Sequence, residues 1–269
     1  MTPTVSSTRT PPALPGPGPQ HFLSLPGART VRVPALDAVA RAVEQTLAEQ
    51  AVMCLYGDAG CGKTYALQTA LNSRPALPGD VHICHLSPRP APTPLVLRAE
   101  LLLAAGLPIP PTRDPGILDT ALRTRLAAHP HLLVMDEASR LTTGCVEYLC
   151  YLFDDPTTQL TLILATSTKG FHTLRRQPLL ATRTTRWLQI HPLTPGEVRR
   201  AIPQLHPRWH DADNDVLDRL DARHGHGNFR RWAQITHHTL RLERRASPSG
   251  KRLLETTLDG CLPPHEDPR

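Results

Sequence analysis

The residues best suited to chemistry form one glycine-rich loop, Gly57–Thr64, of sequence GDAGCGKT. Its glycines let the backbone curl until several N–H groups point at one spot, where the N-terminus of a following helix adds partial positive charge. In such a loop Lys63 bridges the β- and γ-phosphates of a nucleotide and the hydroxyl of Thr64 reaches Mg²⁺. We therefore predict a site for ATP and Mg²⁺; a glycine-rich turn without a ligand is the alternative. The residues assigned to the nucleotide are Gly57, Asp58, Ala59, Gly60, Cys61, Gly62, Lys63, Thr64 and Tyr65, the last of which would be placed to face the base.

Two adjacent carboxylates, Asp136 and Glu137, come directly after the apolar run 132–135. Carboxylates in this position emerge at the C-terminal edge of a parallel sheet, where open α/β folds bind their ligands. We assign Asp136, together with Thr64, to the Mg²⁺ site, and Glu137 to deprotonating the water that attacks the γ-phosphate. This arrangement favours hydrolysis over transfer to a small substrate. A solvated Asp-Glu turn is the alternative interpretation.

A second polar strand end follows the apolar run 159–165, with the sequence QLTLILA. Thr166 or Ser167 at this end would hydrogen-bond the attacking water or the γ-phosphate, and so report which nucleotide is bound. Ordinary loop polarity explains the same residues equally well.

Strands and helices alternate between residues 34 and 190, as expected for parallel βαβ units with helices on both faces of a sheet. The predicted strands are 51–56, 81–86, 132–135, 159–165 and 187–190, and the predicted helices are 34–50, 63–71, 95–105, 117–128 and 144–153. After residue 191 only helices are predicted, at 197–205, 213–224 and 228–244. The expected fold class is α/β: a P-loop parallel sheet of about five strands between helices, followed by a small all-helical lid.

Proline content and periodicity also divide the chain into units. The predicted units are a disordered proline-rich arm over 1–30, a P-loop ATPase core over 31–191, the helical lid over 192–245 and a flexible tail over 246–269.

The motifs GDAGCGKT, LLVMDEASRL, LILATS and HGNFRRW follow the order of Walker A, Walker B, sensor 1 and sensor 2 in the AAA+ ATPases, which the chain therefore resembles. The layout after LILATS is most similar to the branch of transposon target-selection ATPases, the general-secretion ATPase and origin-recognition-like proteins. The resemblance covers residues 30–242. It implies ATP hydrolysis coupled to assembly of several subunits.

The same resemblance implies roles for arginines outside the loop. Arg183 corresponds to an arginine finger that reaches the ATP of a neighbouring subunit, with Arg186 and Arg176 as rivals. Arg230, in GNFR, corresponds to the sensor 2 residue of the lid. Sensor 1 usually carries asparagine in this family, and its replacement here leaves the choice between Thr166 and Ser167 open.

The chain carries a formal net charge of +6, and its basic residues gather near the C-terminus. Nine basic residues and two acidic ones lie between Arg219 and Arg252. Such a stripe suits contacts with the phosphate backbone of duplex DNA. A solvated arginine-rich face is the alternative, because 27 of the 30 basic residues in the chain are arginine.

Other patterns exclude several classes of protein. The six cysteines show neither CxxC pairs nor ligand spacing, so we expect no zinc site and no disulfide framework. The longest apolar runs are too short to span a bilayer, and the N-terminal sequence lacks a signal-peptide pattern. We therefore expect a cytoplasmic protein without membrane insertion.

Three functions fit these patterns. The first is an AAA+ ATPase that forms a homo-oligomer with ATP and acts on duplex DNA or on a DNA-bound protein partner, as transposition ATPases do. The second is a scaffold or signalling switch that binds ATP and turns it over slowly, which the unusual sensor 1 keeps open. The third is a small-molecule kinase, which Glu137 and the all-helical lid disfavour.

Overall fold

A parallel sheet forms the centre of the computed structural model, which describes residues 25–72 and 81–245. Within these residues five parallel strands lie in the order β2-β3-β4-β1-β5. Tyr56 pairs with Thr166, and Met135 with Leu164, so β1, β3 and β4 end at the same edge of the sheet. The strands are β1 Val52–Tyr56, β2 His82–Leu86, β3 His131–Met135, β4 Leu160–Thr166 and β5 Thr184–Gln189.

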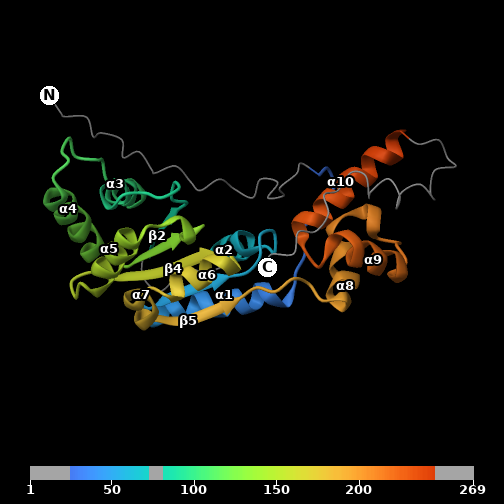
Figure 1. Cartoon of the computed structure of the whole chain (residues 1–269), viewed down its shortest axis with the longest axis horizontal. Helices are drawn as coiled ribbons and strands as arrows, with labels where there is room; N and C mark the ends of the chain where they lie inside the picture. Colours follow the sequence, from blue (N-terminus) through green and yellow to red (C-terminus); the bar gives the residue numbers. More distant parts are fainter. Residues whose placement is uncertain (1–24, 73–80, 246–269) are drawn as a thin grey trace, which may run out of the picture.

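Helices cover both faces of this sheet (Figure 1). The helices of the core are α1 Pro34–Ala48, α2 Lys63–Asn72, α3 Pro94–Ala104, α4 Pro115–Ala128, α5 Thr143–Asp154, α6 Thr168–Arg175 and α7 Pro178–Arg183. Because side chains alternate along a strand, Leu132 and Val134 pack with α1 and α2. Leu133 and Met135 face the opposite layer, with α3, α4 and α5. The predicted α/β class is confirmed.

Polar N-cap residues mark where several core helices begin. The side chains of Thr93, Asp114 and Thr142 accept hydrogen bonds from backbone N–H groups in the first turns of α3, α4 and α5. Such caps satisfy donors that a helix leaves without an internal partner. Proline also occupies the first position of α3 and α4, where its missing N–H costs no hydrogen bond.

Two short helices, α6 and α7, occupy a region where the sequence predicted no regular structure. They contain eight and six residues, which is too short for a periodic apolar pattern to emerge. Their starts nevertheless carry local signals: Ser167 caps α6 through the N–H of Gly170, and Pro178 begins α7.

The lid, residues 192–245, is a separate group of helices at one end of the sheet (Figure 1). Trp209 and Trp232 are buried at its centre with their ring centroids 5.5 Å apart. The helix predicted over 213–224 ends earlier than expected, and a π-helical turn follows it. The lid elements are α8 Pro195–Leu205, a 3₁₀ turn Pro207–Trp209, α9 Asn214–Leu220, the π-helical turn Asp221–Gly225 and α10 Phe229–Arg245.

The segment before α1 packs on the lid. Val31 and Val33 are buried in the apolar cluster of the lid, and the N–H of Arg29 donates to the carbonyl of Leu205 at 2.7 Å. Residues 25–30, at the end of the expected arm, therefore lie against the lid. Residues 1–24 and the expected tail, 246–269, lie outside the described residues.

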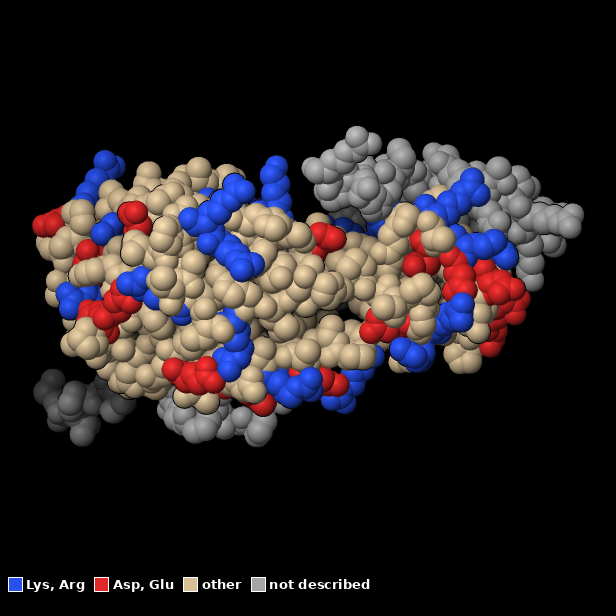
Figure 2. All heavy atoms as spheres, turned by 60° about the horizontal axis from the view of Figure 1, so that its bottom comes forward, with Lys and Arg blue, Asp and Glu red and all other residues tan. Residues whose placement is uncertain are grey.

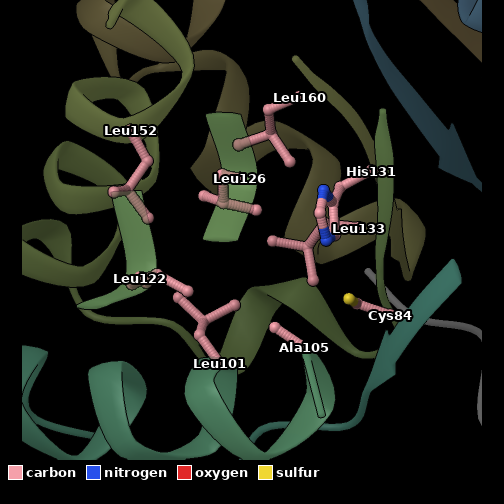
Figure 3. A pocket seen from close by; sticks show the side chains of 9 residues that line it. All are labelled: Cys84, Leu101, Ala105, Leu122, Leu126, His131, Leu133, Leu152 and Leu160. Carbon is pink, nitrogen blue, oxygen red and sulfur yellow. The ribbon is translucent and has the colours of Figure 1, made fainter. Parts of the chain in front are cut away.

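A small apolar cavity lies beneath α3 and α4, on the face away from α1 (Figure 3). His131 lines it with eight other residues, mostly leucines. The Nδ1–H of His131 donates to the carbonyl of His129 at 2.6 Å, and Nε2 is buried with no hydrogen-bond partner in residues 25–72 and 81–245. Burial lowers the pKa of this imidazole, so His131 is a neutral core residue near pH 7.

Among the residues that the structure describes, no helix combines the length and apolarity needed to cross a bilayer. Five cysteines in the same ranges are buried free thiols, and Cys261 lies outside them.

Candidate functional site

The glycine-rich loop joins β1 to α2 and is held closely by its surroundings. Gly57 packs on the carbonyl of Ile190, leaving no space for a Cβ. Gly60 and Gly62 have φ angles of 86° and 94°, the left-handed region that favours glycine. The sequence of the loop thus matches the conformation that it adopts, with α2 beginning at Lys63.

Lys63 is buried and turned back onto its own loop. Its Nζ donates to the carbonyls of Gly57, at 2.8 Å, and Asp58, at 3.0 Å. Burial lowers the pKa of Lys63, and the nearby carboxylates of Glu137 and Asp136 oppose this shift. The ammonium therefore lies against the loop carbonyls, within range of the charges of the two acids.

Thr64 and Asp136 meet across 72 residues of sequence. The hydroxyl of Thr64 donates to Oδ2 of Asp136 at 2.7 Å, and Oδ1 of Asp136 accepts from the N–H of Glu137 at 2.9 Å. A third bond, from the N–H of Asp136 to the carbonyl of Leu86, fixes the backbone at this strand end. These two side chains place oxygen atoms, the ligand type that Mg²⁺ prefers, beside the loop.

Glu137 is exposed and has an unusual backbone conformation. Its φ of 55° and ψ of 43° lie in the left-handed region, which is uncommon for residues other than glycine, asparagine and aspartate. This conformation turns the chain at the end of β3 into the short 3₁₀ turn Ala138–Arg140. Such backbone strain concentrates at functional sites.

The end of β4 approaches the loop through a residue that the sequence did not single out. Thr166 is buried and packs against Gly170, and Oγ1 of Thr166 has no hydrogen-bond partner among the residues that the structure describes. Ser167 caps α6 instead of reaching the loop. The hydroxyl of Thr168 donates to Oδ1 of Asp58 at 2.7 Å. Thr168 therefore links α6 directly to the phosphate-binding loop.

The lid contacts the same loop through the start of α10. Asn228 donates from Nδ2 to the carbonyl of Ala59 at 2.7 Å, and the N–H of Arg230 donates to the carbonyl of Gly60 at 3.4 Å. The Oδ1 of Asn228 also accepts from the N–H groups of Arg230 and Arg231, which caps α10. The structure thus brings the backbone of Arg230 next to the loop.

A buried carboxylate shapes the turn that carries Asn228. Oδ1 of Asp221 accepts from the backbone N–H of Gly227 and from Nε1 of Trp232, each at 2.8 Å. These bonds draw Asp221 inward, which explains why the helical pattern changes to a π-helical turn after Leu220. The lid core therefore fixes the loop that faces the nucleotide site.

The three arginine-finger candidates have different surroundings. Arg183 forms a two-point ion pair with Asp154, with Nε and Oδ1 2.6 Å apart. Arg186 pairs in the same way with Glu49, at 2.8 Å for both bonds. Arg176, after α6, is exposed and forms no side-chain hydrogen bond or ion pair with any described residue.

The other predicted residues lie in the loop and its helix. Cys61 is buried, and burial raises the pKa of its thiol, so it is a packing residue and not a nucleophile. Tyr65 is half-buried in the first turn of α2. Sequence reasoning missed Thr168 and Asn228, although the first lies next to a predicted site residue and the second lies inside the GNFR motif.

Comparison with known proteins agrees with this geometry. Residues 46–174 match the family model of an AAA domain. A search of curated protein sequences found no match. The fold is similar to that of the Aeropyrum pernix ORC2 protein, solved as ADPNP-ADP complexes, with a TM-score of 0.61, 16% identity and coverage of 81% of this chain and 65% of that one.

Two further solved structures show the same fold. The Aeropyrum pernix ORC1 protein, solved in complex with DNA, matches with a TM-score of 0.60, 21% identity and coverage of 81% of this chain and 63% of that one. Cdc6p from Pyrobaculum aerophilum matches with a TM-score of 0.65, 12% identity and coverage of 85% and 65%. This chain thus spans less than two thirds of the length of these proteins. The resemblance to origin-recognition proteins predicted from the motifs is confirmed.

Proposed function

Because this chain carries an AAA domain and has the fold of the AAA+ ATPases, resembling the origin-recognition proteins, we propose that it is a Mg²⁺-dependent ATPase. The observation that carries the proposal is the 2.7 Å contact between Thr64 and Asp136. It joins the phosphate-binding loop to the acidic strand end, where Glu137 follows directly. Two motifs that are distant in sequence thus form one site.

The chemistry follows from these positions. The N–H groups of Gly57–Thr64 bind the β-phosphate of ATP, and Lys63 exchanges its loop carbonyls for phosphate oxygens. Thr64 and Asp136 would hold Mg²⁺, which would supply positive charge beside the phosphates. Glu137 accepts a proton from the attacking water as the water oxygen bonds to the γ-phosphorus. The bond from this phosphorus to the bridging oxygen breaks, and ADP and phosphate leave.

We infer that a second copy of the chain completes the site through Arg176. Arg183 and Arg186 are each held by a carboxylate on their own chain, and an arginine that acts between subunits needs a free guanidinium. Arg176 is exposed and, within the described ranges, forms no such pair. An arginine supplied by a neighbour stabilises charge in the transition state of phosphoryl transfer.

Duplex DNA, or a protein bound to it, is the partner that we propose. The basic stripe between Arg219 and Arg252 supports this, as does the similar fold of ORC1, which was solved in complex with DNA. On the face drawn in Figure 2, basic side chains are interspersed with acidic ones over both core and lid. We therefore expect weak binding to the phosphate backbone of the DNA. The affinity should fall as salt is raised from about 50 to about 200 mM, with the small slope that few phosphate contacts produce.

Steady-state ATP hydrolysis tests the proposal directly. The chain should hydrolyse ATP in the presence of Mg²⁺, and Lys63→Ala should lose ATP binding. Glu137→Gln should bind ATP and hydrolyse it at least about a hundredfold more slowly. Equal hydrolysis by Glu137→Gln and the parent chain would contradict the role of Glu137. Adding duplex DNA should raise turnover; DNA that neither binds at low salt nor changes turnover would exclude it as a partner.

One observation favours a second function, a nucleotide-dependent switch with slow turnover. Thr166 has a hydroxyl in place of the asparagine amide that sensor 1 usually carries, and this hydroxyl is buried against Gly170. A protein of this kind would bind ATP tightly and change its assembly state with little hydrolysis. Sizing the chain with ATP, with ADP and without nucleotide separates this function from rapid turnover.

A further inference from the structure

The lid touches the phosphate-binding loop at three consecutive residues, Ala59, Gly60 and Cys61. Nδ2 of Asn228 lies 2.7 Å from the carbonyl oxygen of Ala59 and 3.9 Å from Sγ of Cys61. The N–H of Arg230 reaches the carbonyl of Gly60. The lid therefore contacts the part of the loop that must reshape when phosphates bind.

The fit at Gly60 is close enough to transmit small movements. A Cβ on Gly60 would lie 2.5 Å from Oδ1 of Asn228 and 2.6 Å from Cβ of Arg230. These distances leave no room for the loop to move toward the lid without displacing Asn228. The lid side is equally constrained, because Asp221 holds the adjoining residue Gly227 from within the lid core.

The side chain of Asn228 bonds both the phosphate-binding loop and the first turn of α10. Its amide N–H donates to the loop, and its amide oxygen caps α10 by accepting from the N–H groups of Arg230 and Arg231. A change in the position of the Ala59 carbonyl thus acts directly on the first turn of the helix that carries Arg230. Serine or alanine at this position lacks the amide that reaches Ala59.

We propose that Asn228 is a positioning residue that couples the phosphate-binding loop to the lid and sets Arg230 beside the bound phosphates. This inference deepens the proposed ATPase function and rests on it. When nucleotide enters, the loop and Lys63 rearrange, and the Asn228 bond carries this change into α10. Without the bond, the lid and loop move independently, and Arg230 loses its fixed position.

Asn228→Ser separates coupling from helix capping. Serine caps helices about as well as asparagine, so α10 should remain folded, but its short hydroxyl replaces the amide. Asn228→Asp is a second variant of equal length that keeps the capping oxygen and loses the donor. Asn214→Ser, at the exposed first residue of α9, is the matched control on the same lid. Thermal unfolding of the full chain checks that all three variants fold.

Hydrogen exchange of the nucleotide-free chain gives the first readout, which does not depend on hydrolysis. We expect faster exchange at residues 59–61 and 226–231 in both Asn228 variants, with unchanged exchange in the sheet and in Asn214→Ser. Wild-type exchange at these residues in Asn228→Ser and Asn228→Asp would overturn the proposal. A different result would contradict the proposed ATPase function: a parent chain that neither binds nor hydrolyses ATP.

A double-mutant cycle with Arg230→Ala gives the second readout. Asn228→Ser should raise KM for ATP by about tenfold. This is the expected effect of losing the hydrogen bond from Asn228 to Ala59 and, with it, the fixed position of Arg230. The double variant should be little worse than Arg230→Ala alone, because both changes remove the same contact. Additive losses in a chain that hydrolyses ATP would show that Asn228 does not act through Arg230.

Discussion

The hydroxyl of Thr64 and the carboxylate of Asp136 form a direct hydrogen bond between the phosphate-binding loop and the end of β3. A hydroxyl oxygen that donates its proton keeps its lone pairs, so the oxygen of Thr64 stays available as a metal ligand while this bond lasts. In the proposed site, Mg²⁺ would therefore bind without breaking the contact.

The charge of Asp136 predicts how Asp136→Asn behaves. Asparagine keeps the shape of the side chain but has one acceptor oxygen, so it can accept from Thr64 or from the N–H of Glu137 but not from both, and it removes the charge that attracts the metal. We expect at least a tenfold higher Mg²⁺ concentration for half-maximal hydrolysis, of the order that loss of a residue supporting the metal ligands causes. Titrating Mg²⁺ at a fixed ATP concentration measures this half-maximal Mg²⁺ concentration. A Mg²⁺ dependence identical to that of the parent chain would remove Asp136 from the metal site.

Alanine substitutions of Arg176 and Arg183 should separate an effect on ATP hydrolysis from an effect on thermal stability. Arg183→Ala breaks the ion pair with Asp154 and should lower the thermal midpoint by about 2–4 °C. Arg176→Ala removes no contact within the described chain and should leave the midpoint unchanged while lowering ATP hydrolysis.

Mixing variants tests whether Arg176 acts between subunits. Arg176→Ala keeps its own Glu137, and Glu137→Gln keeps its own Arg176. A mixture of the two inactive variants should regain activity, because each Arg176→Ala subunit can receive an arginine from a Glu137→Gln neighbour. A mixture as inactive as its components would show that Arg176 is not shared.

Gly60→Ala should disturb the site more than Gly196→Ala in α8. The φ of 86° disfavours alanine, and the new methyl group meets Asn228 and Arg230. We expect KM for ATP to rise by about tenfold or more. Gly196→Ala is the matched control, because nothing lies within 4 Å of its Cβ position in α8. Similar nucleotide affinity in both variants would argue against close packing at Gly60.

His131 predicts a pH dependence of stability. Burial lowers the pKa of this imidazole in the folded state below its ordinary value of 6.5. As pH falls below 6.5, the unfolded state therefore gains a proton before the folded state does, and stability decreases. His131→Leu should reduce the loss of stability between pH 7 and 5, measured by denaturant unfolding at each pH. An unchanged loss would assign the dependence to other groups.

Much of the core was predictable because its signals are local. The strands β1, β3 and β4 are short, mainly apolar runs, and the phosphate-binding loop carries its glycines where the backbone needs positive φ. The ends of β1 and β3 meet because both strands are parallel in one sheet, which places Asp136 beside Thr64. A pattern of alternating strands and helices is sufficient to predict this meeting.

The remaining contacts depend on packing between distant segments. Nothing local distinguishes Thr168, which reaches Asp58, from Thr166, which is buried against Gly170. The pairing of Arg183 with Asp154 also depends on how α7 lies against α5, and the sequence predicted no helix at α7. Sequence patterns thus located the site but not the side chains that connect it to its surroundings.

The lid is joined to the core at two places along the chain. Ala35 and Leu36, in the first turn of α1, pack against the apolar clusters of both units. At the second crossing, Ile190 belongs to the core cluster and Leu193 to that of the lid. Because the chain crosses between the two units at both places, the simplest movement of the lid is a hinge about the line through them. Such a movement would open or close the contact between the start of α10 and the loop, where Asn228 bonds the carbonyl of Ala59.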